Sequence, residues 1–244
     1  MSPSIFPNAI LITGASRGIG AAIAIALAKP GMILALTGRD EAALQVIAKL
    51  CRERGAAAEC FAADLSQSSA QLSRLVSHIQ EVCGPVHTLI NNAGIFLEAS
   101  ILEGDMEAWD QALDVNLKAS IHLTRHVLPS MAAGGAVVFI SSIASRKGYA
   151  GGTNYCAAKF GLLGFAGSLF EDVRERGIKV CSILPGLVNT QMHDGDEKLD
   201  PARMIQPEDV AQAVAFALSM PAHVCPTEIT LQPQHSPRVS RGSL

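Results

Sequence analysis

The chain has 244 residues, of which 49% are hydrophobic and 17% are charged, and its formal net charge is −3. This composition provides enough apolar side chains for a sizeable core and excludes an intrinsically disordered chain. The length suits one large α/β domain, and the lysines and arginines are too scattered to favour a nucleic-acid partner.

Six cysteines are spread along the chain without a Cys-x-x-Cys pair, which argues against a zinc site or a thioredoxin-type motif, so no metal is expected. A chain of this length without a disulfide framework is typical of a reduced, cytoplasmic protein. The N-terminal residues have no basic segment before a long apolar run, and no stretch approaches about 18 consecutive apolar residues. We therefore predict neither a signal peptide nor a membrane span.

Short apolar runs alternate with longer segments of helical periodicity. The runs predict strands over residues 9–13, 32–37, 58–62, 88–91, 136–141, 179–184 and 228–231. Helices are predicted over 18–29, 40–54, 66–83, 107–131, 153–176 and 207–219. This alternation indicates a doubly wound α/β fold, with a parallel sheet of about seven strands covered by helices on both faces. In such sheets, ligands bind beyond the carboxyl ends of the strands.

We expect residues 1–232 to form one nucleotide-binding catalytic domain. The polar residues 233–244 are predicted to be a tail that is loosely ordered or lies on a neighbouring subunit.

A glycine-rich turn follows the first predicted strand and opens the first predicted helix, with the sequence Thr13-Gly14-Ala15-Ser16-Arg17-Gly18-Ile19-Gly20. Gly14 allows a sharp turn, Gly18 lets the backbone approach a pyrophosphate, and Gly20 lets the helix pack on the sheet. The helix N-terminus offers free N–H groups to the phosphates. The spacing is Gly-x-x-x-Gly-x-Gly rather than Gly-x-Gly-x-x-Gly, but its position after the first strand predicts a nucleotide site.

The end of the second predicted strand bears on the choice between NAD and NADP. A carboxylate at this place would bind the ribose 2′-hydroxyl of NAD. Gly38 stands there instead, and Arg39 and Arg17 can pair with a 2′-phosphate. Asp40 is the competing acid, and we interpret it as the N-cap of the following helix. The sequence therefore favours NADP, with NAD as the alternative.

Tyr155 and Lys159 are four positions apart in a predicted helix, so their side chains share one face. A phenol with a pKa of about 10 is a poor acid or base at neutral pH. An ammonium group beside it favours the phenolate and lowers its pKa. A tyrosine tuned in this way can give a proton to a carbonyl oxygen or take one from an alcohol. Alone, the pattern also fits an ordinary surface tyrosine.

Five motifs together resemble the short-chain dehydrogenase/reductase family in its short single-domain form. In chain order they are the glycine loop 13–20, Asp64-Leu65, Asn91-Asn92-Ala93-Gly94, Ser142, and Tyr155 with Lys159. Ser142 precedes Tyr155 by thirteen residues, the usual spacing in that family. Asn116 matches its fourth catalytic position, and Pro185-Gly186-Leu187-Val188-Asn189-Thr190 matches the segment that holds the nicotinamide carboxamide. The resemblance runs from about residue 8 to residue 231 and implies a Rossmann-type fold.

The resemblance implies an oxidoreductase that transfers a hydride between nicotinamide and a ketone or secondary alcohol, without a metal. Tyr155 would be the acid and base, and Lys159 would tune it and bind the nicotinamide ribose. Ser142 would orient the substrate carbonyl. Asn116 would open the helix main chain for a water that relays protons to Lys159, although a lone mid-helix asparagine more often is a solvated or capping residue.

The resemblance also implies most of the cofactor contacts. Asp64 and the backbone of Leu65 would bind adenine, and Thr190 with the backbone of Val188 would bind the carboxamide. The segment 91–94 would line the ribose and the cofactor floor, although Asn92 is also suited to pinning neighbouring strands. The cofactor candidates are Gly14, Ser16, Arg17, Gly18, Ile19, Gly20, Arg39, Asp64, Leu65, Asn91, Ala93, Gly94, Tyr155, Lys159, Pro185, Gly186, Val188 and Thr190.

The polar segment 191–206 is expected to close over a small-molecule substrate, with its charged residues in solvent. Ile95-Phe96-Leu97 adds an apolar edge that suits a mid-sized ketone with an apolar flank. The predicted helices 107–131 and 153–176 carry apolar residues on more than one face, which favours a homo-oligomer, either a dimer or a homotetramer.

Three alternatives differ from a general carbonyl reductase. A 3-oxoacyl-carrier-protein reductase is disfavoured because the turn 131–135 is not basic and no Asp-Gly-Gly follows the last strand. A regulator that binds the cofactor without turnover is disfavoured because Ser142, Tyr155 and Lys159 are all present. A sugar-nucleotide epimerase or dehydratase would need a C-terminal substrate domain, for which 244 residues leave no room.

Overall fold

A seven-stranded parallel sheet forms the centre of the computed structural model, which describes residues 9–238. The strand order is β3-β2-β1-β4-β5-β6-β7. The order reverses between β1 and β4, the switch point at which ligands bind in doubly wound sheets. The strands are β1 Ala9–Thr13, β2 Ile33–Gly38, β3 Ala57–Ala62, β4 Val86–Asn91, β5 Ala136–Ile140, β6 Lys179–Pro185 and β7 Glu228–Leu231.

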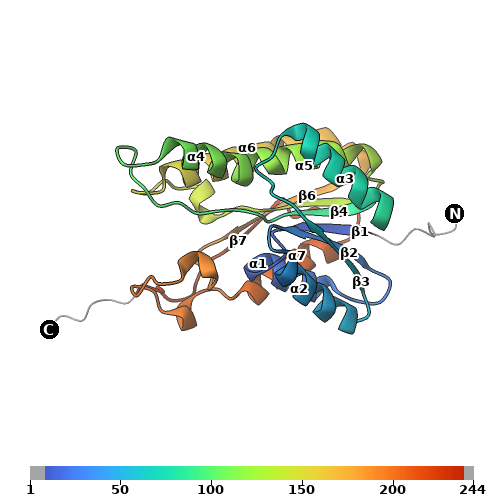
Figure 1. Ribbon diagram of the computed structural model, residues 1–244, viewed down its shortest axis with the longest axis horizontal. Coiled ribbons are helices and arrows are strands. Elements are labelled where there is room, and N and C mark those ends of the chain that lie inside the picture. Colours follow the sequence, from blue (N-terminus) through green and yellow to red (C-terminus); the bar gives the residue numbers. More distant parts are fainter. Residues whose placement is uncertain (1–8, 239–244) are drawn as a thin grey trace.

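Helices cover both faces of the sheet, as predicted. Figure 1 shows α1, α2 and α7 on one face and α3, α4, α5 and α6 on the other. Their bounds are α1 Gly18–Leu27, α2 Glu41–Glu53, α3 Ser69–Cys83, α4 Met106–Leu113, α5 Ala119–Val127, α6 Thr153–Val173 and α7 Pro207–Ser219. Within residues 9–238, no helix is both long and apolar enough to span a membrane.

The apolar core is divided into two clusters by the sheet. Side chains alternate along a strand, so Ile10 and Ile12 of β1 pack under α1, α2 and α7, whereas Leu11 packs under α3, α5 and α6. Every residue of β1 and β5 is buried. Burial on both faces explains why these strands are continuous apolar runs rather than alternating ones.

Side-chain caps set the starts of several helices, among them α2 and α3. The Asp40 carboxylate accepts a hydrogen bond from the Ala43 N–H at 3.0 Å, which confirms its interpretation as the N-cap of α2. Ser68 and Gln71 form a capping box at the start of α3. This box explains why α3 begins at Ser69 rather than at residue 66, where the periodicity alone placed its start.

The predicted helix over 107–131 was wrong in being continuous. A π turn over Asp114–Lys118 separates α4 from α5, and a 3-10 turn over Leu128–Ser130 follows α5. The π turn holds the buried side chain of Asn116, which bonds both backbone groups of Ile95 at 2.8 Å each. Pro129 lies in the 3-10 turn, where its missing N–H is tolerated. Widened π turns occur often at functional sites.

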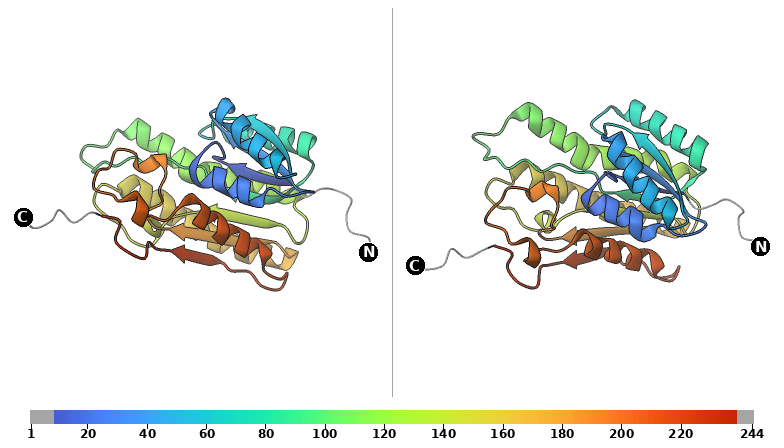
Figure 2. Two further views of the ribbon diagram at one scale, coloured as in Figure 1. Left: turned by 90° about the horizontal axis from the view of Figure 1, so that it is seen from below. Right: turned by 60° about the horizontal axis from the view of Figure 1, so that its bottom comes forward.

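Residues 237 and 238 pair with the loop 191–206 of their own chain, in contrast to the expectation of a tail that is loosely ordered or lies on a neighbouring subunit. Arg238 forms an antiparallel bridge with Leu199, and the Pro237 carbonyl accepts from the Asp200 N–H at 2.8 Å. Figure 2 shows this end of the chain beside the segment around Leu199. The tail residues 239–244 lie outside the described residues.

Candidate active site

A cavity of about 920 Å³ lies at the carboxyl ends of the strands. It extends from the glycine loop, past the end of β5, to the loop 191–199 and Arg238. The predicted site residues that line it are Gly14, Ser16, Arg17, Gly18, Ile19, Arg39, Asp64, Leu65, Ala93, Gly94, Ser142, Tyr155, Lys159, Pro185, Gly186, Val188 and Thr190. The predicted residues Gly20, Asn91 and Asn116 are absent from its lining.

The glycine loop forms a backbone cradle at one end of the cavity. Gly14 and Gly18 have φ angles of +63° and +54°, a region that other residues rarely adopt. A Cβ at Gly20 would lie 2.2 Å from the Gly14 carbonyl oxygen, so Gly20 supports the loop from behind. The cradle leads into the N-terminus of α1, whose free N–H groups and dipole suit a phosphate. These residues therefore fit a dinucleotide pyrophosphate.

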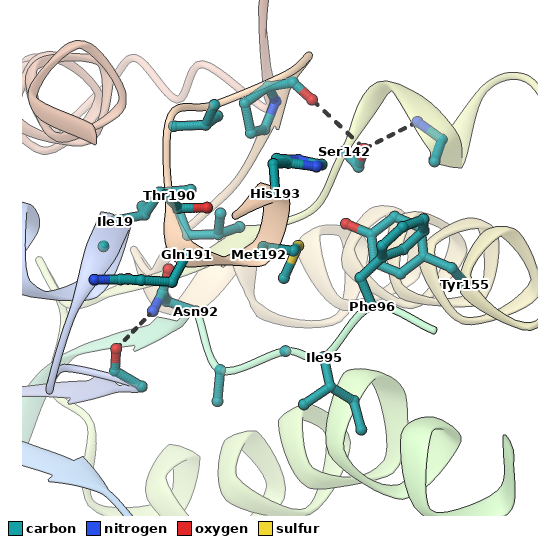
Figure 3. Close-up of a pocket in the computed structure, with 18 of the residues that line it drawn as sticks. Ile19, Asn92, Ile95, Phe96, Ser142, Tyr155, Thr190, Gln191, Met192 and His193 are labelled. Carbon is teal, nitrogen blue, oxygen red and sulfur yellow. Dashed lines mark hydrogen bonds between the residues drawn. The ribbon is translucent and has the colours of Figure 1, made fainter. Parts of the chain in front are cut away.

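Asn92 and Thr13 fasten the end of β4 to this cradle. The Asn92 amide donates to the carbonyls of Thr13 at 2.8 Å and Gly14 at 3.2 Å. The Thr13 hydroxyl in turn accepts from the backbone N–H groups of Asn92 and Ala93. Figure 3 shows Asn92 among the residues that line the cavity. Asn92 thus pins two strand ends, the structural role that the sequence left open for it.

Asn91 lies away from the cavity, in contrast to the expectation that it contacts the cofactor. It is 2% exposed, and its amide donates to the Thr124 hydroxyl at 3.2 Å. Successive residues of a strand point to opposite faces, so Asn91 is directed toward α5 while Asn92 reaches β1. The pattern of two adjacent asparagines does not reveal which of them faces the ligand.

Two cations stand at the end of the cavity beyond β2. Arg17 and Arg39 are exposed there and line the cavity. Neither forms an ion pair with an acid among residues 9–238. Asp40 is engaged as a helix cap, and Asp64 accepts from the backbone and hydroxyl of Ser66 at 2.9 Å each. This end of the cavity thus presents cations that are free to bind a phosphate.

Ser142, Tyr155 and Lys159 meet at the end of β5. Ser142 follows β5, and its hydroxyl accepts from the Ala144 N–H at 3.1 Å and donates to the Pro185 carbonyl at 3.5 Å. Tyr155 and Lys159 lie one turn apart on α6, as predicted. In Figure 3 the Tyr155 hydroxyl is on the side of the ring nearer Ser142. The two hydroxyls therefore face the same part of the cavity.

Burial dominates the titration of this pair. It raises the pKa of Tyr155 to about 12, against the opposing effect of a hydrogen bond with Ser142. It lowers the pKa of Lys159 to about 8. The Lys159 ammonium donates to the Ile140 carbonyl at 3.0 Å and lies 5.5 Å from the centre of the Tyr155 ring. The expected lowering of the Tyr155 pKa is therefore not seen, because desolvation penalises the charged forms of both groups.

Asn116 acts on the site from behind the cavity wall. Its side chain holds the backbone of Ile95, next to Gly94. A Cβ at Gly94 would lie 2.9 Å from the Asn116 Oδ1 and 3.8 Å from the Lys159 Nζ. In the π turn, the Ala119 N–H donates to the Asp114 carbonyl, a bond across five residues. The opened helix that the resemblance implied is thus present at Asn116.

The other end of the cavity has a wall of rings. The Phe96 ring packs edge-on against Tyr155, with centroids 5.2 Å apart at 85°, and lies 6.3 Å from the His193 ring at 51°. Burial lowers the pKa of His193. The charged groups of this loop are mostly exposed, as predicted, although His193 is partly buried and lines the cavity together with the exposed Asp196. Arg238 was missed altogether, because its place depends on pairing between the tail and a distant loop.

Metal ligands are not gathered in the described part of the chain, where no group of three or more His, Cys, Asp or Glu residues has a suitable arrangement.

Comparison with known proteins gives a consistent family assignment. The family model described as "short chain dehydrogenase" matches residues 8–199. An uncharacterized oxidoreductase from Staphylococcus saprophyticus is 36% identical over 91% of this chain and 96% of that protein. A sepiapterin reductase from Chlorobaculum tepidum is 33% identical over 92% of this chain and 95% of that protein.

The fold agrees with the same assignment. A short chain dehydrogenase from Burkholderia cenocepacia, solved in complex with NADP, superposes with a TM-score of 0.84 and 30% identity. The match covers 95% of this chain and 98% of the other. The chain therefore belongs to the short-chain dehydrogenase/reductase family and is an NAD(P)-dependent oxidoreductase that acts on small molecules.

Proposed function

We propose that this oxidoreductase interconverts a ketone and a secondary alcohol with NADP as cofactor. The proposal depends on one observation above all. Ser142, Tyr155 and Lys159 line the same cavity as the glycine cradle, so a nucleotide held by the cradle reaches the two hydroxyls. When bound, the nicotinamide group supplies or accepts the hydride. The glycine loop would hold the pyrophosphate of the cofactor, and Thr190 and Lys159 would hold its nicotinamide end.

The side chains divide the proton chemistry between them. Ser142 donates a hydrogen bond to the substrate carbonyl oxygen, and Tyr155 gives that oxygen its proton. A Tyr155 pKa of about 12 keeps the phenol protonated at neutral pH, as the reduction of a ketone requires. Lys159, with a pKa of about 8, is largely cationic at pH 7 and stabilises the phenolate once the proton has left.

Asn116 supports the return of the proton. Its side chain is occupied by Ile95, and the π turn around it changes the main-chain bonding of the helix next to Lys159. We propose that a water bound at this opened main chain relays protons between Lys159 and solvent. Asn116 is then a positioning residue, since it does not line the cavity.

A panel of ketones with NADPH, followed at the NADPH absorbance band, tests the reaction. The panel includes sepiapterin, since one relative is named for it, and 3-oxoacyl thioesters, which test the carrier-protein-reductase alternative. We expect wild type to reduce at least one ketone with an apolar flank. Tyr155→Phe should lower kcat by about 10²–10⁴-fold without weakening NADPH binding, because only the proton donor is lost.

The remaining tyrosine provides a matched control. Tyr149 also lines the cavity, but it is 47% exposed, and we expect Tyr149→Phe to change kcat by less than about fivefold. Full activity in Tyr155→Phe would overturn the assignment of the acid. NADPH binding without turnover of any ketone would favour the cofactor-binding regulator.

The preference for NADP is carried by Arg17 and Arg39, which have no acidic partner among residues 9–238. The Burkholderia structure was solved with NADP. Arg39→Gln should lower the ratio of kcat/KM with NADPH to that with NADH by about tenfold or more, because a charge-assisted bond to the 2′-phosphate is lost. Lys29→Gln, a cation that does not line the cavity, is the control. Equal use of both cofactors by wild type at low concentration would contradict the preference.

We also propose a cytoplasmic homo-oligomer, a dimer or a tetramer. Several large apolar side chains remain exposed on or beside the helices, among them Ile101, Leu102, Met106, Phe160 and Phe216. Light scattering of the purified protein tests the assembly, and a monomer at micromolar concentration would contradict it. The six free cysteines, all in the described part of the chain, are consistent with a reducing compartment.

A further inference from the structure

The cavity wall contains a cation that the proposed reaction does not use. Arg238 lines the cavity together with His193, Asp196 and Leu199. It lies beyond the last strand, in a part of the chain that the predicted fold did not require. Its side chain is exposed, so the guanidinium group is accessible to a ligand that enters the cavity.

Backbone bonds fix the position of Arg238. It bridges Leu199 in an antiparallel arrangement, and its N–H donates to the Ser236 hydroxyl at 3.3 Å. Its neighbour Pro237 is buried and accepts from the Asp200 N–H at 2.8 Å. The tail is therefore a strap across the loop 191–206, and the Arg238 side chain enters the wall from a defined backbone position.

The guanidinium group has no ion-pair partner among residues 9–238. Arg203, in the loop 191–206 that the tail crosses, does have an ion-pair partner: its Nε lies 3.2 Å from an Asp200 carboxylate oxygen. Asp196 also lines the cavity, and its carboxylate accepts a hydrogen bond from the Lys198 N–H at 3.0 Å. Glu98 also lines the cavity, but it packs against Gly151 on another loop.

We propose that Arg238 binds a carboxylate of the substrate, so that the preferred ketone is a keto acid. This inference rests on the proposed function, because the carbonyl must reach Tyr155 and Ser142 while the carboxylate reaches Arg238. The guanidinium fork matches a carboxylate bidentately, which gives orientation as well as affinity. The Phe96 ring lines the same cavity, so we expect the part of the substrate between its carbonyl and its carboxylate to be apolar.

The test uses methyl ketones that end in a carboxylate, with linkers of increasing length, each paired with its methyl ester. We expect wild type to show a higher kcat/KM for the acid than for the ester at one optimal length. Arg238→Gln should lower the acid-to-ester ratio by about tenfold or more, and Arg238→Lys should restore part of it, because the charge returns without the fork. The KM for NADPH should stay the same, since Arg238 is not among the residues proposed to hold the cofactor.

Arg203→Gln is the matched control, because it removes a cation of the same loop that does not line the cavity. An acid-to-ester ratio unchanged in Arg238→Gln, or lowered equally in Arg203→Gln, would overturn the proposal. Calorimetric binding of the same pairs to the NADP-saturated protein separates this inference from the proposed reaction. Loss of carboxylate preference in Arg238→Gln then supports the subsite even if no ketone is turned over, whereas equal binding of acid and ester by wild type refutes it.

Discussion

The two ends of the cavity are fixed by different means. The cofactor end is made of backbone: Gly14 and Gly18 turn through left-handed conformations, and Asn92 and Thr13 tie the loop to the neighbouring strand. The substrate end is made of side chains such as Phe96, on segments that begin far apart in the chain. It is closed by a strap whose bridge joins Leu199 to Arg238.

This difference separates cofactor binding, which uses backbone groups, from substrate selection, which uses side chains. A backbone cradle tolerates little change, because a Cβ added at Gly14 or Gly20 meets a main-chain neighbour, and it binds a group common to all nicotinamide dinucleotides. A wall of side chains can change without disturbing the sheet, so the choice of substrate resides there. Three variants test this division.

Gly20→Ala should have the largest effect and should act on the cofactor end. The new Cβ would lie 2.2 Å from the Gly14 carbonyl oxygen and 2.5 Å from the Asn92 Nδ2, so the loop must shift. We expect the free energy of unfolding to fall by about 3 kcal/mol and the Kd for NADPH to rise by about tenfold or more. Denaturant titration and fluorescence binding measure these effects. Gly148→Ala, where a Cβ meets nothing within 4 Å, is the control, and equal behaviour of the two variants would refute a rigid cradle.

Lys159→Met tests how much the buried Lys159 ammonium lowers the free energy of unfolding. Burial lowers its pKa from 10.5 to about 8, so at pH 7 the folded state carries the full penalty of a buried charge. Between pH 8 and 10.5 the unfolded state holds more protons on Lys159 than the folded state does, so stability rises with pH. Wild type should therefore gain about 2–3 kcal/mol relative to Lys159→Met between pH 7 and pH 10.

Parallel denaturant titrations of wild type and Lys159→Met across this pH range measure that difference. The bond to the Ile140 carbonyl is stronger for the ammonium than for the neutral amine and so opposes part of this pH dependence, but desolvation is the largest cause of the pKa shift and sets the sign of the slope. A stability difference that stays constant with pH would show that the ammonium is not desolvated in the folded protein.

Phe96→Ala should have the smallest effect and should act on the substrate end alone. The ring contacts Tyr155 edge-on, so its removal takes away an apolar wall beside the reacting carbonyl. We expect kcat/KM for a ketone with an apolar flank to fall by about tenfold, with no change in the Kd for NADPH. Phe96→Leu should recover most of the activity, and Phe216→Ala, an exposed ring on α7 outside the cavity, is the control. Weakened NADPH binding in Phe96→Ala would contradict the separation of cofactor binding from substrate selection.

Much of the fold follows from local patterns. The strands β1 and β7 and the helix α7 have the predicted bounds, and the other strands differ by one or two residues at their ends. These elements are predictable because buried parallel strands are short apolar runs and the helices have a clear period. The break at Asn116 was implied by the family resemblance but not by the periodicity, because the π turn depends on a contact between Asn116 and Ile95, a residue of another segment.

The sequence by itself determined the sheet, the glycine cradle and the spacing of Ser142, Tyr155 and Lys159, because each depends on residues that are close in the chain. Only the tertiary structure decided that Asn92 rather than Asn91 faces the cradle, that burial raises rather than lowers the pKa of Tyr155, and that Arg238 enters the cavity wall. These features depend on which groups surround a side chain after folding. Desolvation and pairing between distant segments therefore cannot be read from the spacing of residues in the sequence.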